Sequence, residues 1–314
     1  MRYPRGGDEK RRAAPRSAGE GPTPLRVITF VRYPALEVGV ALGYFDAEHL
    51  AVSVDLTPSS IVQMQGLTAG RWDVAITSFD NLLVSATREG ESSVAFGVAD
   101  RADLPFFVRP EIAGYDHLRG QPIAADAVDT AFALVLRRLL LAHGLDVARG
   151  DYSLVAVGAN AERLDSLRRR DTVAAILAPP YDAAAREAGL RQLGHHREVL
   201  PDYPGQMMAA PAAWLGSAAN RAAAVRFLRA WRRAAAWSTE PANRAAAVAL
   251  LTQRQGISLA AAAVLLDGVI EDVALDRAGP ASVLDVRLAL GLMTPPGPRL
   301  EAYYDARLDE EARR

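Results

Sequence analysis

Cysteine is absent from this chain of 314 residues, and lysine occurs only once, at Lys10. Without cysteine the protein can form no disulfide, thiol adduct or thiolate metal site. A Schiff base to a carbonyl compound requires a lysine amine, and so does a phosphate-binding P-loop. The single lysine precedes the predicted folded body. The two absences argue against covalent cofactor chemistry, and we expect no cofactor and no metal ion.

The chain also lacks an excess of charge of either sign, and it lacks long apolar runs. Lysine and arginine total 36 and aspartate and glutamate 37, which gives a formal net charge of −1. That balance argues against a nucleic-acid surface or a polybasic membrane patch. No segment has the roughly 18 uninterrupted apolar residues of a membrane span, so we expect no direct span.

Residues 1–24 are basic, contain proline and glycine and have no apolar run, so we expect a disordered tail. A secretory signal needs an apolar core of about 7–15 residues after its basic start. None is present here. By this criterion the chain as written carries no export address, which would make it cytoplasmic.

What the sequence does contain is a regular alternation of apolar runs and segments with helical periodicity. Strands are predicted at 25–31, 52–56, 74–77 and 94–98, with helices at 34–42, 61–69 and 79–88. A second series has predicted strands at 106–109, 122–125, 154–157 and 173–177, with helices at 130–143, 161–169 and 180–188. Such alternation indicates parallel sheets covered by helices, an α/β fold.

The later part of the chain predicts a return strand and then helices. The strand is expected at 206–210, and the helices at 218–238, 242–253, 258–270, 281–291 and 299–312. We therefore predict two lobes, with residues 25–103 and 205–314 in lobe 1 and residues 104–204 in lobe 2. The chain would cross between them near 100–106 and 200–206, which suits hinge closure around a ligand in an interlobe cleft.

Small polar residues and tyrosines lie where predicted strands end. Ligands bind at such carboxyl ends in parallel sheets. The candidate ligand-binding residues are Tyr33, Thr57, Ser59, Ser60, Thr77, Ser78 and Asn81 in lobe 1, and Asp129, Thr130, Tyr181 and Tyr203 in lobe 2 and its return crossing. Tyr33 and Tyr181 are expected to be aromatic walls, and the others to make polar contacts. These groups have little intrinsic reactivity, which favours a receptor over a catalyst.

Other polar residues receive structural interpretations. Ser59 or Ser60, Asp80, and Asp129 or Thr130 are suitable helix N-caps. The pair His195–His196 is expected to be solvated at the surface, because no nearby carboxylate spacing completes a metal site. No nucleophile and base lie together in the sequence, so no catalytic residue is assigned.

Several phrases, in order, resemble a known family. They are ALGYFDAEHLAVSVDLTPSS at 41–60, QMQGLTAGRWDVAITSFDNLLV at 63–84, DHLRGQPIAA at 116–125, and the segments 174–193 and 212–247. This set is similar to ABC-transporter substrate-binding proteins of the sulfonate/nitrate/taurine and thiamine-pyrimidine group. The resemblance covers roughly residues 25–255. It implies a two-lobed type II periplasmic-binding-protein fold, reversible capture of a small molecule, delivery to an ABC permease, and a periplasmic location.

The chain departs from that family at the first helix of lobe 2. Many anion-binding members place hydroxyl residues at this helix N-terminus, where the dipole favours anions. Here Asp126 and Asp129 would repel an anion unless an arginine such as Arg32 or Arg101 offsets them. We therefore expect a neutral or amine-bearing heterocycle as the ligand.

Two other functional classes remain open. One is a cytoplasmic, cofactor-independent enzyme on the same fold, such as a decarboxylase, which the missing export signal would suit. The other is a cytoplasmic ligand-sensing module without a DNA-binding element of its own. Pyrimidine synthases of related fold rely on an active-site lysine and a cysteine-rich motif, which this chain lacks.

Overall fold

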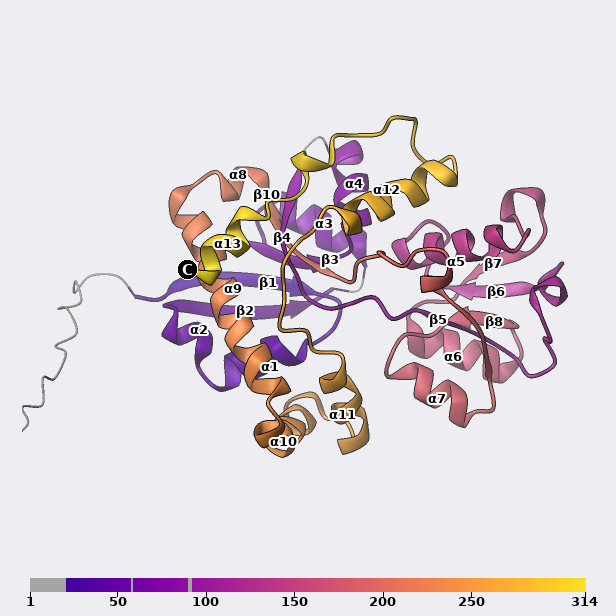
Figure 1. The fold of residues 1–314 in the computed structure, drawn as a ribbon, viewed down its shortest axis with the longest axis horizontal. Coiled ribbons are helices and arrows are strands. Elements are labelled where there is room, and N and C mark those ends of the chain that lie inside the picture. Colours follow the sequence, from indigo (N-terminus) through magenta and orange to yellow (C-terminus); the bar gives the residue numbers. More distant parts are fainter. Residues whose placement is uncertain (1–20, 58, 90–91) are drawn as a thin grey trace, which may run out of the picture.

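The computed structural model describes residues 21–57, 59–89 and 92–314, and it has two sheets, each covered by helices (Figure 1). Residues 1–20 of the predicted tail, and Pro58, lie outside the described residues. The prediction that the tail extends to residue 24 is wrong at its end, because the first strand begins at Thr23. There Thr23 donates its backbone N–H to the carbonyl of His49, which starts the pairing with the second strand.

The first sheet contains strands from both ends of the chain. Its order is β2-β1-β3-β10-β4, and the strands are β1 (Thr23–Thr29), β2 (Leu50–Leu56), β3 (Val74–Thr77), β4 (Ser93–Val98) and β10 (Met207–Pro211). β1 pairs in parallel with β2 and β3, whereas β10 is antiparallel to β3 and β4. The predicted return strand at 206–210 is therefore confirmed, and it lies between β3 and β4.

Helices cover both faces of this sheet. They are α1 (Pro34–Ala41), α2 (Tyr44–Ala47), α3 (Ser60–Thr68), α4 (Phe79–Glu89), α8 (Ala212–Leu215) and α9 (Ala218–Thr239). The long helix α9 packs on α1 and α2, where Phe227 stacks on Phe45 with ring centroids 5.2 Å apart. Buried apolar residues at helical spacing on α9, among them Val225, Leu228 and Trp231, form the core of this face. On the opposite face α3 and α4 pack together.

The second sheet contains five strands in the order β7-β6-β8-β5-β9. They are β5 (Pro105–Val108), β6 (Pro122–Ala125), β7 (Ser153–Ala156), β8 (Ala174–Ile176) and β9 (Arg191–His195), with α5 (Ala131–Ala142), α6 (Asn160–Arg169) and α7 (Tyr181–Glu187) as the covering helices. β6 is parallel to β7 and β8. Short 3₁₀ turns lie at Tyr115–Leu118, Val147–Arg149 and His196–Glu198. The sequence analysis did not predict β9, which is short, partly exposed and rich in polar residues.

The C-terminal region contains α10 (Arg244–Gln255), α11 (Leu259–Asp267), α12 (Ala278–Ala289) and α13 (Arg307–Arg313), with 3₁₀ turns at Pro241–Asn243 and Leu300–Ala302. The single helix predicted at 299–312 is wrong over its first half. Ala95 of β4 donates its N–H to the carbonyl of Tyr303, and the N–H of Asp305 donates to the carbonyl of Ala95. These bonds hold the segment extended along β4, so a helix starts only at Arg307.

None of the described helices alone is long and apolar enough to cross a membrane. Only Pro241–Gln255 taken together with Leu259–Asp267, a pair bent by 115°, passes that test, and it does so by length and composition.

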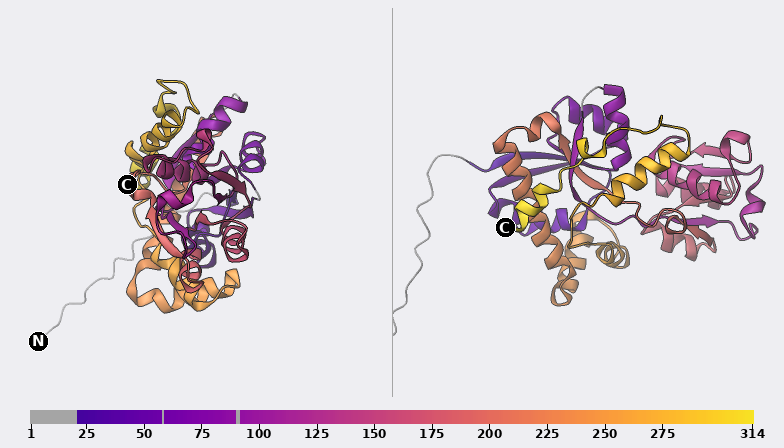
Figure 2. Two further views of the ribbon diagram at one scale, coloured as in Figure 1. Left: turned by 90° about the vertical axis from the view of Figure 1, so that its right-hand side faces the viewer. Right: turned by 45° about the horizontal axis from the view of Figure 1, so that its top comes forward.

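The chain crosses twice between the sheets, and the two crossings are hydrogen-bonded to each other. Ala99 donates its N–H to the carbonyl of Gln206 at 2.8 Å, and Arg101 forms an isolated bridge with Pro204. Helix α12 lies beside them and contacts both α4 and α5, as the right-hand view of Figure 2 shows. The strands divide at the proposed lobe limits 103/104 and 204/205, and a buried apolar cluster continues from one half into the other.

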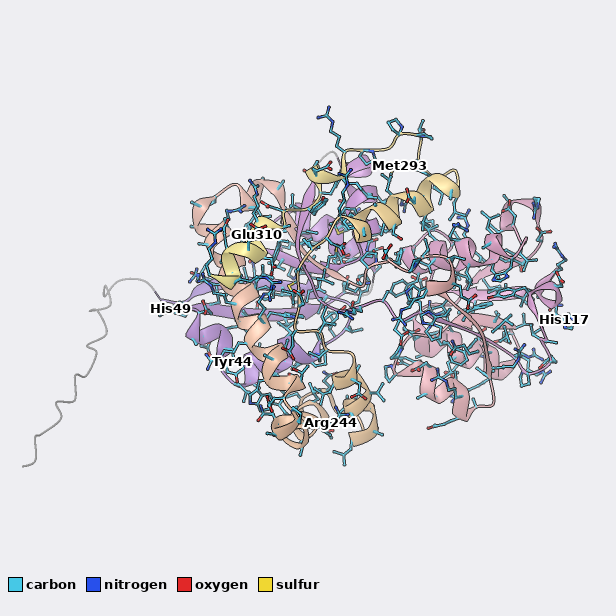
Figure 3. All side chains as sticks on the ribbon, viewed as in Figure 1. Tyr44, His49, His117, Arg244, Met293 and Glu310 are labelled. Carbon is cyan, nitrogen blue, oxygen red and sulfur yellow. The ribbon has the colours of Figure 1, made fainter. Side chains whose placement is uncertain are left out.

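The two sheets are oriented with the carboxyl ends of their parallel strands inward. Figure 3 places His49, which precedes β2, and His117, which precedes β6, at opposite outer ends of the molecule. The amino ends of β2 and β6 therefore lie outside. The residues after β1, β2 and β3 and those after β6, β7 and β8 form two facing edges, which we call the lobe 1 edge and the lobe 2 edge.

Candidate functional site

The lobe 1 edge brings together the polar residues that the sequence placed at strand ends. Thr29 at the end of β1 pairs with Leu56 of β2 and Ile76 of β3, so the three strands end side by side. Asn81 donates from Nδ2 to Oγ1 of Thr77 at 2.9 Å. Thr77 is fully buried and Asn81 partly exposed, so Thr77 holds the amide at the edge. Oγ of the buried Ser78 has no hydrogen-bond partner among the described residues.

The turn between β2 and α3 is held by its own hydroxyl groups. Ser59 is the N-cap of α3, and its Oγ accepts the N–H of Val62 at 3.3 Å. Thr57 donates its hydroxyl to the carbonyl of Ser59 at 2.8 Å. Ser60 is the first helical residue and is partly exposed. The sequence predicted that Ser59 or Ser60 caps α3, and the contacts show that Ser59 does so.

A glutamine that the sequence analysis missed lies below this edge. Gln63 is fully buried on α3, and its Nε2 donates to the carbonyls of Ile28 at 3.3 Å and Ile76 at 3.1 Å. Its Oε1 has no partner among the described residues. The side-chain amide thus joins β1 to β3 directly beneath their ends, and only an unusual polar residue on an apolar helix face signals it in the sequence.

The predicted capping role of Asp80 is replaced by an ion pair. Its carboxylate accepts Nε and Nη2 of Arg287, on α12, at 2.6 and 2.8 Å, and both side chains are at least nine-tenths buried. The sequence separation of 207 residues hid this partner. The charge at the start of α4 is therefore compensated within the protein, and α12 is fixed to the lobe 1 edge.

Tyr33, predicted as an aromatic wall, is mostly buried. It is 6% exposed, and its ring lies 5.9 Å from that of Trp231. The carboxylate of Asp100 in the first crossing accepts the N–H of Gln206 at 2.6 Å. Burial, and then the negative charge of Asp100, raises the pKa of the Tyr33 hydroxyl well above its usual value. Desolvation raises the pKa of Asp100 to about 7, against the hydrogen bond from Gln206. Tyr33 is therefore mostly enclosed, and its role as an aromatic wall stays a prediction.

The lobe 2 edge is charged. Asp126, after β6, accepts the hydroxyl of Thr130 at 2.7 Å on Oδ1, and Nη1 of Arg163 lies 3.7 Å from the same oxygen. Thr130 is the N-cap of α5 as predicted, but its side chain makes no cap hydrogen bond. Asp129 is exposed on this corner. From the sequence we named Arg32 or Arg101 as the arginine that could offset these carboxylates. The structure instead places Arg163 beside Asp126, and Arg32 pairs with Glu37.

Arg163 is held from below. Its Nη2 donates to Oδ1 of Asn160 at 2.8 Å, and that oxygen also accepts the N–H of Ala178 at 3.0 Å. The side chain is 4% exposed, and burial lowers the pKa of its guanidinium, against the nearby Asp126. Arg163 therefore joins α6 to the ends of β6 and β8.

The two remaining tyrosines lie in different places. Tyr181 begins α7 and packs, partly buried, against the apolar cluster around Phe107. Tyr203 lies in the second crossing and is 7% exposed. Burial, and then the negative charge of Asp80, raises the pKa of Tyr203 well above its usual value, and Asp126 from the other half contributes in the same direction.

Exposed apolar side chains gather at the same place. After β1 and β2 and in the first turn of α3 lie Phe30, Val31, Leu56, Ile61 and Val62, between 36% and 56% exposed, which we call the apolar rim. Val128, 52% exposed, lies on the lobe 2 edge. Sequence reasoning treated these residues only as strand and helix positions, because their exposure follows from the way the lobes face each other.

The expectation of a solvated histidine pair is wrong. His196 is 1% exposed, and its Nδ1 accepts the N–H of Leu104 at 3.3 Å. His195 ends β9, and its Nε2 lies 2.8 Å from Oδ1 of Asp103. Burial lowers the pKa of His196 to about 4, so it stays neutral. The crossing covers the pair, and the described residues contain no group of three or more His, Asp or Glu that could hold a metal ion.

Two hollows lie away from the predicted residues. One, of about 500 Å³, is lined by Arg101, Asp103 and Arg197 and by the segment 267–272. The other, of about 380 Å³, lies between α12 and residues 199–202. None of the predicted ligand-binding residues lines either one.

The chain is similar to known proteins in sequence and in structure. The model of the NMT1-like family matches residues 116–252, which include most of lobe 2 and its return crossing. No curated protein matches the sequence. The matched range includes the segments 174–193 and 212–247, on which part of the sequence resemblance rests.

Solved structures match nearly the whole chain. The alkanesulfonate-binding protein of Xanthomonas axonopodis pv. citri, bound to MOPS, is 15% identical with a TM-score of 0.73, over 91% of this chain and 100% of that one. A Candida albicans protein described as having the generic periplasmic-binding-protein fold is 14% identical with a TM-score of 0.71, over 91% and 96%. This chain has the periplasmic-binding-protein fold.

The same fold occurs in the periplasmic nitrate-binding protein of Synechocystis PCC 6803, which is 14% identical with a TM-score of 0.73, over 92% of this chain and 88% of that one. These similarities confirm the predicted two-lobed α/β fold and the resemblance inferred from the sequence.

Proposed function

We propose that this protein is a solute-binding protein that captures a small organic molecule between the lobe 1 and lobe 2 edges. The observation that carries the proposal is the convergence of two strand-end edges, each with polar side chains. In parallel sheets such edges are the usual ligand positions. Asn81 and Ser59 lie on one edge and Thr130 and Asp126 on the other.

The chemistry of the edges supports binding without turnover. The carboxylate and guanidinium of Asp80 and Arg287 are paired and buried, and no histidine lies in the hydrogen bonds of Thr77, Ser59 or Thr130. A serine or threonine without a base is a weak nucleophile. The ligand-binding set that we propose comprises Ser59, Ser60, Thr77, Ser78, Asn81, Asp129, Thr130, Tyr181 and Tyr203. Tyr33 is the proposed aromatic wall at the end of β1.

The similar proteins include alkanesulfonate- and nitrate-binding proteins. By analogy we propose that the captured molecule is passed to an ABC-type permease. For the ligand itself we propose a neutral or amine-bearing heterocycle, because carboxylates stand at the lobe 2 edge.

Two measurements test the proposal. Native mass spectrometry of the purified protein identifies small molecules that stay bound, and each is then added back to ligand-free protein. Small-angle X-ray scattering should show a smaller radius of gyration on addition, because ligand shifts an open–closed equilibrium toward closure. Conversion of the added molecule to a product, without compaction, would contradict the receptor function.

A further inference from the structure

The apolar rim is a concentrated feature, since exposed large apolar side chains are few elsewhere on the described residues. The other exposed ones are Leu42, Val128, Leu259 and Leu292, and of these Val128 lies on the facing edge. The rim comes from three separate segments: the residues after β1, the end of β2 and the first turn of α3. A solvated apolar patch at a proposed binding edge favours a ligand with an apolar body.

The lobe 2 edge offers a hydrogen-bond acceptor. Oδ1 of Asp126 accepts the hydroxyl of Thr130, and the nearest nitrogen of Arg163 lies 3.7 Å from that oxygen, beyond hydrogen-bond distance. The carboxylate is 32% exposed and is therefore reachable. The hydroxyl of Thr130 and Nη2 of Arg163 are already engaged as donors. An ionised carboxylate only accepts hydrogen bonds, so its partner must donate one.

The N-terminus of α5 does not reverse the preference of the lobe 2 edge for a hydrogen-bond donor over an anion. Its positive end would attract an anion by about 0.3–2 kcal/mol. Asp126, however, is hydrogen-bonded to the N-cap residue, so the protein itself already supplies an anion there. Asp129 adds a second carboxylate to the corner. A ligand anion would have to approach both.

We propose that the two edges together select an amphipathic molecule, with a cationic N–H donor that binds Asp126 and an apolar body that rests on the apolar rim. This inference rests on the proposed function and names its substrate class. The ammonium or amidinium head gains a charge-assisted hydrogen bond at lobe 2, and the body loses water at lobe 1. A molecule with only one of the two parts engages only one lobe.

Three probes with one body and different heads test the head: 2-phenylethylammonium, 2-phenylethanol and 2-phenylethanesulfonate at equal millimolar concentration. The melting temperature should rise most with the ammonium probe and least with the sulfonate. Asp126→Asn should weaken binding of the ammonium probe by about ten- to a hundredfold and leave 2-phenylethanol unchanged. Asp165→Asn, an exposed carboxylate on α6 outside the proposed site, is the control and should leave binding of the ammonium probe unchanged. The melting temperature of each variant without probe reports its folding.

Methylammonium and a rim variant test the body. Methylammonium alone should give no shift. Ile61→Asn should weaken all three phenyl probes equally, whereas Leu259→Asn, an exposed apolar residue on α11, should weaken none. Methylammonium as effective as 2-phenylethylammonium would overturn the role of the rim.

The remaining outcomes separate this inference from the proposed function. A larger shift with the sulfonate probe would overturn the cationic head and leave solute binding intact. The cationic head is likewise overturned, with solute binding intact, if no probe shifts the melting temperature while a retained molecule still compacts the protein. Absence of both probe binding and any retained molecule would overturn the inference and the proposed function together.

Discussion

The two facing edges have the same strand-to-helix geometry but opposite chemistry. At lobe 1, the hydroxyl of Ser59 accepts the N–H of its own helix, and the nearby charge of Asp80 is cancelled by a buried partner. At lobe 2, Thr130 gives its hydroxyl to Asp126, a buried arginine, Arg163, lies 3.7 Å away, and the carboxylates remain partly or fully exposed. Topology therefore determines where the edges meet, whereas a few loop residues and distant arginines decide their charge.

The greatest loss of stability should come from disturbing the neutrality of the lobe 1 edge. Arg287→Ala leaves Asp80 buried without a partner, and we expect it to lower the free energy of unfolding by about 3–5 kcal/mol. Chemical denaturation measures the loss.

The matched control is Arg307→Ala, because that side chain is 76% exposed beside Asp305, and it should cost far less stability. Replacing both partners, Asp80→Leu with Arg287→Met, should recover much of the stability. Equal losses for Arg287→Ala and Arg307→Ala would show that the buried pair does not set this edge apart.

The crossing between the edges should respond to pH through Asp100. Its folded pKa of about 7 lies above its ordinary value of 3.8, so the folded protein binds the proton more tightly. The contribution of Asp100 to stability is complete below the ordinary value. It falls as the pH rises toward 7, by at most about 1.4 kcal/mol per pH unit.

Unfolding measured across this range should show wild type losing stability relative to Asp100→Asn as the pH rises, with no further change above the folded pKa. A pH-independent difference between the two proteins would mean that the carboxyl of Asp100 is not protonated in the folded state.

The neutral polar groups of lobe 1 should affect ligand affinity. Thr77→Ala together with Asn81→Ala removes an amide and the hydroxyl that holds it, and we expect affinity for the retained molecule to fall by roughly ten- to a hundredfold. Calorimetry measures the change. Ser282→Ala, in the hollow beside α12, is the control. An unchanged affinity in the folded double variant would remove these two residues from the site.

A smaller difference should separate the two N-caps. Ser59→Ala removes a cap hydrogen bond of α3 and should cost about 0.5–1 kcal/mol of stability. Thr130→Ala removes no cap hydrogen bond and should cost less, while it frees Asp126 and changes ligand affinity. Thermal unfolding and calorimetry of the two variants distinguish these roles, and equal losses of stability would refute the contrast.

Local patterns predicted the elements of the fold well. The strands at 74–77 and 122–125 have the predicted bounds, and most other elements differ by one to three residues. Their apolar runs are long enough to be recognised without tertiary context. By contrast β9 is held by pairing with β5, and the start of the predicted helix at 299–312 is extended by bonds to Ala95. Both depend on residues far away in the sequence.

The candidate site was predictable in position but not in charge. Strand-end logic placed Asn81 and Thr130 on the two edges. No local signal indicated that Arg163 would compensate Asp126 from α6, or that Arg287 would compensate Asp80 from α12. In a chain with so many arginines, type and spacing do not mark which ones become buried. The role of Tyr33 as an aromatic wall stays a prediction, and its side chain is 6% exposed.

The place of β10 between β3 and β4 has a consequence for biosynthesis. These two strands are joined only through β10, which the ribosome adds after every strand of the second sheet. The second sheet has low sequence separation and all its strands available earlier, so we expect it to fold first. Until Met207 emerges, β3 and β4 expose unpaired backbone, which is prone to aggregation. A chain arrested after residue 206 should resist limited proteolysis in 104–204 and be cleaved within 21–98.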